Sequence, residues 1–136
     1  MIQKIRSPSP EASEREALRR RVKQMYEWLN RERWEGCFSL LDPKLAEANI
    51  EQTTYSQSLQ AFKEAYGSIH PWYVRISLHL EKSANKRDPR PFAYVYVVWQ
   101  DDAHRFHMFR ERWVKHSGRW FTRVVGLVPN QQESVS

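Results

Sequence analysis

The sequence predicts an α+β domain in which helical segments cover one face of a four-stranded antiparallel sheet. Two observations predict this fold. Apolar residues recur at helical spacing up to residue 66, and after Pro71 they alternate with a period of two. In addition, both faces of the strands expected over residues 92–128 are rich in apolar and aromatic side chains. A sheet of that composition needs a cover on each side, so we expect helices over a pocket on one face and a partner on the other.

The length and composition fit one folded domain. The chain has 136 residues, of which 40% are hydrophobic. Its six Trp, six Tyr and six Phe residues give it more apolar surface than a disordered chain has. We expect residues 1–9 to be a flexible lead-in, residues 10–129 to form the domain, and residues 130–136 to be a frayed tail.

The first helix is predicted from its cap and its periodicity. Ser9 can cap a helix whose first position is Pro10. Tyr26 lies beside the apolar stripe of this helix, which runs to about Trp34. The stripe consists of residues at spacings of four, three and four, namely Leu18, Val22, Met25 and Leu29.

Further helical pieces follow before the strands begin. A short helix carries the apolar stretch 38–41, and Asp42 directly before Pro43 is typical of an N-cap followed by a first helical position. Thr54 begins a longer helix with a capping box, and Gly67 ends it. Four strands are then expected over residues 72–81, 91–100, 105–114 and 119–128.

Two tight turns set the expected register of the last three strands. If Asp102–Ala103 and Ser117–Gly118 are two-residue hairpins, opposed residues share a face of the sheet, and a slip of one residue would exchange the faces. The face expected under the helices collects Phe92, Tyr94, Tyr96, Val98, His107, Phe109, Glu111, Trp113, Thr122, Val124 and Val128. The other face collects Ala93, Val95, Val97, Trp99, Phe106, Met108, Arg110, Arg112, Phe121, Arg123, Val125 and Leu127.

A mixed polar and aromatic group lies at the centre of the face expected under the helices. His107 and Glu111 are the candidate catalytic residues, because in an apolar enclosure burial would raise the pKa of the carboxyl and the imidazole could exchange a proton. In the structural alternative, Glu111 pairs with an arginine and His107 lies at a wet edge of the sheet. The candidate ligand-binding residues are Tyr94, Tyr96, Phe109, Trp113 and Tyr26.

The opposite face mixes arginines with apolar residues and is the expected dimer contact. Arg112 opposes Arg123 in the expected register, an arrangement that needs an anionic ligand or acidic groups of a partner to neutralise it. The alternative is a solvent-exposed face on which arginine stems pack over apolar neighbours. The expected dimer residues are Trp99, Phe106, Met108, Arg110, Arg112, Phe121 and Arg123.

Several functional classes lack their motifs. Cys37 is the one cysteine, so no internal disulfide and no cysteine-based zinc site is expected, and its apolar surroundings indicate a buried small residue. The histidines show no metal-binding spacing and the four glycines form no phosphate loop, so neither a metal nor a cofactor is expected. No stretch has the apolar length of a membrane span or a signal peptide, which favours a cytoplasmic protein.

The net charge of +6 and the pI of about 9.7 invite a nucleic-acid interpretation. The arginines are spread along the chain, however, and the one dense block is residues 19–21. We therefore attribute the charge mainly to surface solubility, and nucleic acid is not an expected partner.

The order of elements and two segments resemble the nuclear transport factor 2-like superfamily, also described as cystatin-like or SnoaL-like. The segments are Trp34–Pro43 after the first helix and Glu111–Trp120 across the last hairpin. The resemblance covers roughly residues 11–128 and implies a curved sheet that forms a cone with the helices, a pocket inside the cone, and homodimers through the outer sheet face. Enzymatic members use Asp, His or Tyr inside the cone, and their nearest counterparts by position are His107, Glu111, Tyr94 and Tyr96.

The superfamily includes isomerases, dehydratases, polyketide cyclases and non-catalytic binding or assembly domains, so the fold leaves the function open. The leading hypothesis is a domain that binds a small apolar or aromatic ligand in its cone, or a dimeric assembly module. The first alternative is an isomerase or dehydratase with His107 or Glu111 as general base. The second alternative is single-stranded nucleic-acid binding, which the charge and the interleaved aromatic residues suggest.

Overall fold

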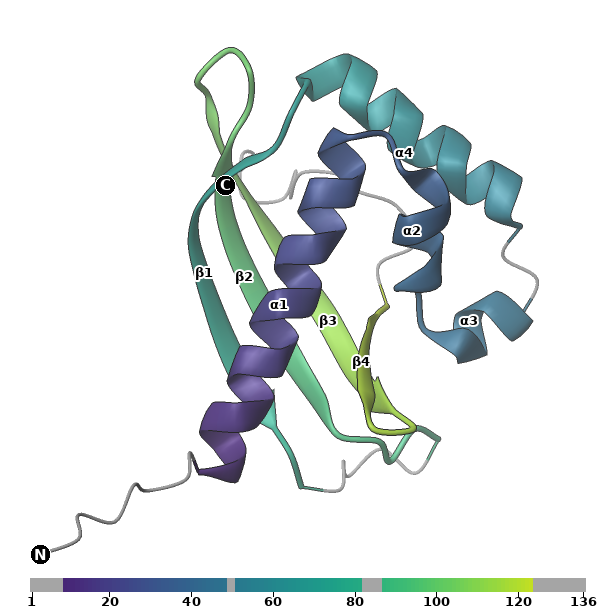
Figure 1. Ribbon diagram of the computed structural model, residues 1–136, viewed down its shortest axis with the longest axis vertical. Helices are drawn as coiled ribbons and strands as arrows, with labels where there is room; N and C mark the ends of the chain where they lie inside the picture. The colour runs from purple at the N-terminus through teal and green to yellow at the C-terminus, as the bar shows by residue number, and fades with distance from the viewer. Residues whose placement is uncertain (1–8, 49–50, 82–86, 124–136) are drawn as a thin grey trace, which may run out of the picture.

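The computed structural model describes residues 9–48, 51–81 and 87–123, and it confirms the predicted α+β class (Figure 1). The helices are α1 (Pro10–Asn30), α2 (Trp34–Ser39), α3 (Pro43–Glu47) and α4 (Gln52–Tyr66). The strands are β1 (His70–His79), β2 (Phe92–Gln100), β3 (Phe106–His116) and β4 (Arg119–Thr122). They form one antiparallel sheet in the order β1-β2-β3-β4. The predicted lead-in up to residue 8, the end of the predicted fourth strand and the predicted tail lie outside the described residues.

The helix signals in the sequence are confirmed in part. Ser9 caps α1 by accepting a hydrogen bond from the backbone N–H of Ala12 at 3.1 Å. This helix ends at Asn30 rather than near Trp34, where α2 begins instead. The capping box predicted at Thr54 is wrong, because α4 begins two residues earlier, at Gln52.

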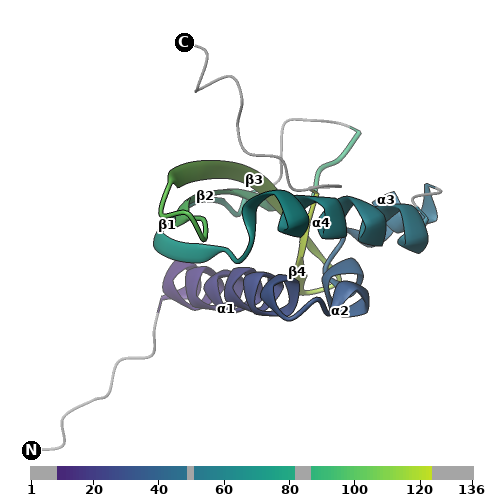
Figure 2. The same ribbon diagram turned by 90° about the horizontal axis from the view of Figure 1, so that it is seen from above.

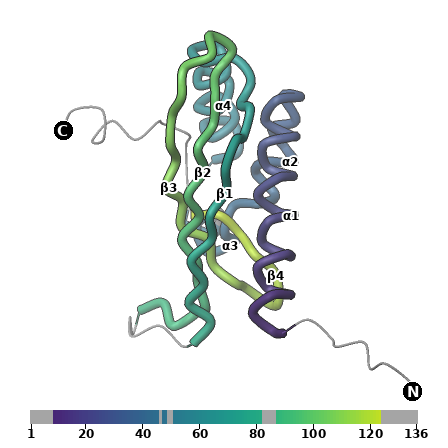
Figure 3. Tube along the Cα trace, turned by 90° about the vertical axis from the view of Figure 1, so that its left-hand side faces the viewer, coloured from purple at the N-terminus to yellow at the C-terminus, as the bar shows by residue number. Residues whose placement is uncertain are grey.

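The helices pack on one side of the three long strands, as Figures 2 and 3 show for α1 and α4. The predicted stripe of α1 is buried in the core, and Tyr55, Leu59 and Phe62 of α4 are buried with it. The largest fully buried side chains are those of Trp99, Trp113 and Trp120. These aromatic residues supply much of the apolar area that a domain of this size has to bury.

The register between β2 and β3 differs by one residue from the prediction. Trp99 pairs with His107 and Val97 pairs with Phe109. The turn has three residues between Asp101 and Arg105 rather than two, and His104 in it has a φ of 64°. A type I turn followed by a residue with positive φ is a common three-residue hairpin.

The carboxylate of Asp101 holds this turn together. Its Oδ1 atom accepts hydrogen bonds from the backbone N–H groups of Ala103 and Arg105, both at 2.9 Å. Its Oδ2 atom accepts hydrogen bonds from Arg105 Nε and His107 Nε2, again both at 2.9 Å. Burial opposes ionisation of this group, but the hydrogen bonds outweigh burial and hold the pKa of Asp101 well below its usual range.

The extra residue in the turn exchanges the two faces of β2 relative to the prediction. Ala93, Val95, Val97 and Trp99 face the helices and are fully buried, and Phe109, Glu111 and Trp113 of β3 are buried beside them. Tyr94 and Tyr96, which were expected in the pocket, therefore lie on the outer face of the sheet. Trp99, which was expected in the dimer contact, lies in the core.

The second turn agrees with its prediction. His116 pairs with Arg119, and the two residues between them are Ser117 with a φ of 49° and Gly118 with a φ of 81°. A two-residue turn with positive φ at both positions is the type that matches the twist of an antiparallel pair. The register of β3 with β4 is therefore the expected one.

Other parts of the described chain contact both edges of the sheet. At β4, Leu41 forms a parallel bridge with Thr122, and the backbone N–H of Asp42 donates to the Thr122 carbonyl at 2.8 Å. At β1, Arg19 Nη1 of α1 donates to the carbonyl of Val74 at 3.1 Å.

A buried ion cluster fastens α3 to the sheet. The side chain of Asp42 has no exposed surface and binds Arg90 through both carboxylate oxygens, at 2.7 and 2.8 Å. Arg123 donates to it at 2.8 Å, and Arg90 also pairs with Asp88. Burial raises the pKa of Asp42, but the hydrogen bonds from the two arginines outweigh it and lower the value to about 2.

We predict that Asp101→Ala loosens the β2–β3 turn and destabilises the fold, because two backbone N–H groups and the side chains of Arg105 and His107 lose their acceptor. Amide hydrogen exchange at Ala103 and Arg105 should become faster by about tenfold or more, as expected for the loss of one or two hydrogen bonds. The urea midpoint should fall in parallel.

Asp102→Ala is the matched control, because Asp102 is the next residue and its exposed side chain pairs with His70. It should change the exchange rates and the urea midpoint much less. Equal effects of the two substitutions would contradict the organising role of Asp101.

Candidate functional site

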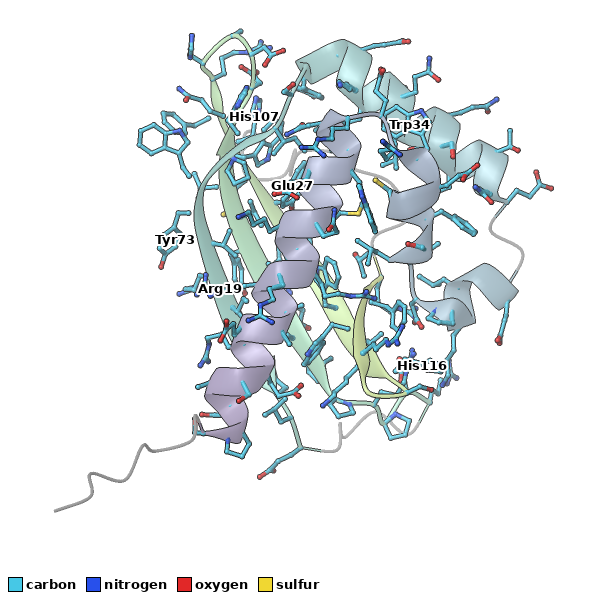
Figure 4. The ribbon with its side chains drawn as sticks, viewed as in Figure 1. Arg19, Glu27, Trp34, Tyr73, His107 and His116 are labelled. Carbon is cyan, nitrogen blue, oxygen red and sulfur yellow. The ribbon has the colours of Figure 1, made fainter. Side chains whose placement is uncertain are left out.

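A groove runs between α1 and β1 and is the candidate site. Its volume is about 440 Å³, and it is called the α1–β1 groove below. It is lined by Arg19, Val22, Lys23, Tyr26, Glu27 and Asn30 of α1 and by Pro71 and Val74 of β1. Figure 4 shows Arg19 and Glu27 on α1, and Tyr73 on the side of β1 that points away from that helix.

The helical period explains how α1 presents this lining. Val22 and Tyr26 are one turn apart and belong to the buried side of the helix, while Arg19 and Lys23 are one turn apart on its exposed side. The apolar pair therefore forms the floor of the α1–β1 groove and the basic pair forms its rim. Val74 adds an apolar wall from the strand.

A buried carboxyl lies behind the floor of the groove. Tyr26 donates a hydrogen bond from its hydroxyl to Glu111 Oε2 at 2.9 Å. Both residues are only 2% exposed, and the Tyr26 ring stacks on Phe109 at 6.3 Å between centroids. The structure thus brings together Tyr26, Glu111 and Phe109, three residues that the sequence placed in a pocket.

Burial sets the protonation of this pair. Desolvation raises the pKa of Glu111 to about 7, against a smaller opposing effect of the hydrogen bond from Tyr26. Desolvation and the adjacent carboxylate raise the pKa of Tyr26 well above its usual value. The carboxyl therefore exchanges its proton near neutral pH, while the phenol stays protonated and acts as a donor.

Another phenol lies close to the same carboxyl. The hydroxyl of Tyr55 is buried and has no hydrogen-bond partner within the described part of the chain. Burial raises the pKa of Tyr55, and the charges of Cys37 and Glu111 add to that effect. Cys37 itself is buried, as the sequence predicted, and burial raises the pKa of its thiol to about 12, so it is no nucleophile.

His107 does not join Glu111 in a catalytic pair. The two residues face the same side of β3 but are four residues apart, which is about 13 Å along a strand. His107 binds Asp101, stacks on Trp99 at 4.5 Å between centroids, and meets Tyr66 edge-on at 5.3 Å. Figure 4 shows it near one end of β3, with His116 near the other.

The remaining sequence-predicted site residues are divided between the core and the outer face. Trp113 is fully buried in the core, and Arg123 pairs with Asp42. The basic rim of the α1–β1 groove, Arg19 and Lys23, was not predicted as part of a site. The sequence does place these two basic residues one helical turn apart beside the apolar stripe of α1. That spacing indicates a binding site only when the position of β1 next to α1 is known. The expected dimer residues that do lie on the outer side of the sheet are Phe106, Met108, Arg110 and Arg112, whereas the ring of Phe121 in β4 lies under the guanidinium of Arg21 of α1.

Among the described residues, no group of three or more His, Cys, Asp or Glu side chains has a geometry that could hold a metal ion. No helix in the same part of the chain is long and apolar enough to cross a membrane. Comparison with protein-family models, with curated proteins and with solved structures finds no match to this chain. The geometry of the α1–β1 groove and of the sheet is therefore the basis for any functional proposal.

We predict that Glu111 makes the protein less stable as the pH rises from about 4.5 to about 7. The folded protein retains a proton on Glu111 up to about pH 7, whereas the unfolded chain loses it near pH 4.5. The stabilising contribution is therefore complete below pH 4.5 and decreases by about 3 kcal/mol as the pH rises through the folded-state pKa. Urea unfolding between pH 5 and 8 measures this slope.

Glu111→Gln should flatten the pH dependence and should be more stable than the parent protein at pH 8, because it keeps the acceptor for Tyr26 without a charge. Tyr26→Phe is the matched control. It removes the hydrogen bond that favours the carboxylate, so the pH dependence should persist and extend to higher pH. Parallel profiles for the parent protein and Glu111→Gln would show that Glu111 does not titrate in this range.

Proposed function

We propose that this chain is a nuclear transport factor 2-like domain that binds a small apolar or aromatic ligand with an anionic group. A long first helix, shorter helices and an antiparallel meander support the superfamily assignment. The observation that carries the function is the α1–β1 groove, whose volume of about 440 Å³ falls in the range of small-molecule sites, roughly 300–1,000 Å³.

The lining of the α1–β1 groove determines the class of ligand. Val22, Tyr26 and Val74 offer an apolar and aromatic floor, on which a planar or aliphatic group buries its surface. Lys23 and Arg19 on the rim favour a carboxylate or another anion. One acidic residue, Glu27, lies at the far end of this row, one turn beyond Lys23, so the anion is expected between Lys23 and Arg19, away from Glu27.

The buried pair beneath the floor has a positioning role in this proposal. The hydrogen bond to Glu111 fixes the phenol of Tyr26, so the ring forms a rigid surface and its hydroxyl is unavailable to the ligand. A preformed floor reduces the entropy that is lost when a ligand binds.

Binding fits this geometry better than catalysis. A general base has to lie within hydrogen-bond reach of the proton that it removes. Glu111 lies behind Tyr26 and is 2% exposed, and His107 is held by Asp101 outside the lining of the groove. Neither predicted catalytic residue therefore reaches a ligand in the α1–β1 groove.

We predict that phenylacetate and naphthoate bind in the α1–β1 groove. In a titration followed by amide chemical shifts, saturable changes should centre on Val22, Lys23 and Val74. Lys23→Glu should weaken binding by about tenfold, because it replaces the attractive charge with a repulsive one. Val74→Trp should abolish binding by filling the groove.

Two control variants make this titration specific. Arg31→Glu changes the net charge by the same amount at an exposed position outside the groove lining, and Ser77→Trp adds an indole to the opposite face of β1. Both should bind like the parent protein. Shift changes that centre on the outer sheet face, or equal losses in Lys23→Glu and Arg31→Glu, would overturn the proposal.

A further inference from the structure

The outer face of β1–β3 is a second candidate binding surface, independent of the α1–β1 groove. No helix of the described chain lies on that side of the three strands (Figure 3). Its middle consists of arginines alternating with aromatic residues, and it is called the aromatic–arginine face below. The residues that define it are Arg75, Arg110, Arg112, Phe92, Tyr94 and Tyr96.

Each arginine of this face lies over an aromatic ring. The guanidinium carbon of Arg75 is 4.7 Å from the centroid of Tyr96, and that of Arg110 is 4.8 Å from Tyr94. The guanidinium carbon of Arg112 is 4.5 Å from the centroid of Phe92. Such contacts hold the guanidinium planes along the sheet without using their hydrogen-bond donors.

These three arginines have no carboxylate partner within the described residues. Arg90, Arg105 and Arg123, by contrast, each bind an aspartate. The outward-facing positions of β1–β3 contain no Asp or Glu in the ranges of these strands. The face therefore has a positive charge that the described chain does not neutralise.

One end of the same surface exposes large aromatic side chains. Trp72 is 67% exposed, Tyr73 is 58% exposed and Phe106 is 56% exposed. The register of β1 is irregular between Pro71 and Tyr73, and the indole of Trp72 donates a hydrogen bond to Gln100 Oε1 at 3.0 Å. Trp72 meets the ring of Phe106 edge-on at 5.2 Å between centroids. Exposed flat rings beside unpaired arginines are the two components of a surface that stacks bases and binds phosphates.

A second copy of the chain does not complement this surface. A two-fold dimer places the same patch against itself, so the three arginines of one copy would be buried against the three of the other. With no acidic residue among the outward positions, that burial would remove charges from water without neutralising them. A polyanion, in contrast, supplies both the missing charge and flat groups that stack.

We propose that the aromatic–arginine face binds single-stranded nucleic acid. Phosphates bind Arg75 and Arg110, which lie opposite each other on either side of Tyr96, and Arg112 in the next row, and bases stack on Trp72 and Phe106 at the exposed aromatic end. The strands are nine to eleven residues long, so the whole track along the face, arginines and aromatic end together, is at most about 30 Å. The contacts identified are to charges and ring faces, so recognition is largely independent of sequence.

The test is fluorescence anisotropy with a fluorescein-labelled oligothymidine of about 20 nucleotides, which is longer than the track, and with oligouridine of the same length. Binding should weaken as salt rises from about 50 to 200 mM, and the emission of the exposed Trp72 should be quenched. The matching duplex should bind more weakly, because its bases are not free to stack.

Two double variants with the same net charge distinguish binding at this face from unspecific attraction to a basic protein. Arg75→Gln with Arg110→Gln should weaken binding by about tenfold and reduce the salt slope by about 1.4, which corresponds to two phosphate contacts. Arg31→Gln with Arg33→Gln, at exposed positions beside α1 and α2, should have little effect. Trp72→Ala should weaken binding by about tenfold through lost stacking.

Three results would overturn the proposal. The first is the absence of an anisotropy change at low salt. The second is an equal loss of affinity in both double variants, which would indicate unspecific attraction to a basic protein. The third is concentration-dependent self-association in sedimentation that Trp72→Ala or the Arg75 and Arg110 variant abolishes, which would assign this face to a second copy of the chain.

Discussion

The carboxylate of Asp101 determines which face of the sheet each residue of β2 occupies relative to β3. It binds two backbone N–H groups of the turn and the side chains of Arg105 and His107, and so fixes a three-residue connection. Because side chains alternate along a strand, one residue more or less in the turn exchanges an entire set of side chains. The burial of Trp99, the position of Glu111 relative to its neighbours on β2, and the aromatic–arginine face all depend on this connection. One buried carboxylate at the end of the sheet therefore sets the chemistry of both of its surfaces.

Local signals predict the elements of this fold well and predict one register wrongly. The α1 stripe and the Ser9 cap are confirmed because periodicity and capping act within a few residues of the chain. The Ser117–Gly118 turn is confirmed because two adjacent residues can adopt positive φ there. The segment Asp101–Arg105, however, is compatible with a connection of two or three residues. The choice depends on His104 adopting positive φ and on His107 reaching Asp101, and the second of these is a contact in space.

The candidate site likewise contains residues that local sequence predicts and contacts that only the tertiary packing creates. Glu111 within an apolar strand and Tyr26 beside an apolar stripe were both recognisable from the sequence. Their hydrogen bond joins residues 85 positions apart, so no local pattern contains it. Tyr94 and Tyr96 were assigned to the wrong face by the register, and Arg19 and Lys23 were not predicted because their role depends on how α1 lies against β1. Local sequence therefore specifies which side chains are available, while the packing of helix on sheet decides which of them meet.

The contacts at the two margins of the sheet limit how this protein can associate. An open strand offers a row of unpaired backbone groups on which another chain can add as a further strand. Here the segment around Leu41 bridges to β4, and the guanidinium of Arg19 occupies a carbonyl of β1. Growth by strand addition, the route to swapped oligomers and fibres, is obstructed at both of these places. The described helices leave the aromatic–arginine face uncovered, and at these two places the contacts hinder a further strand from adding beside it.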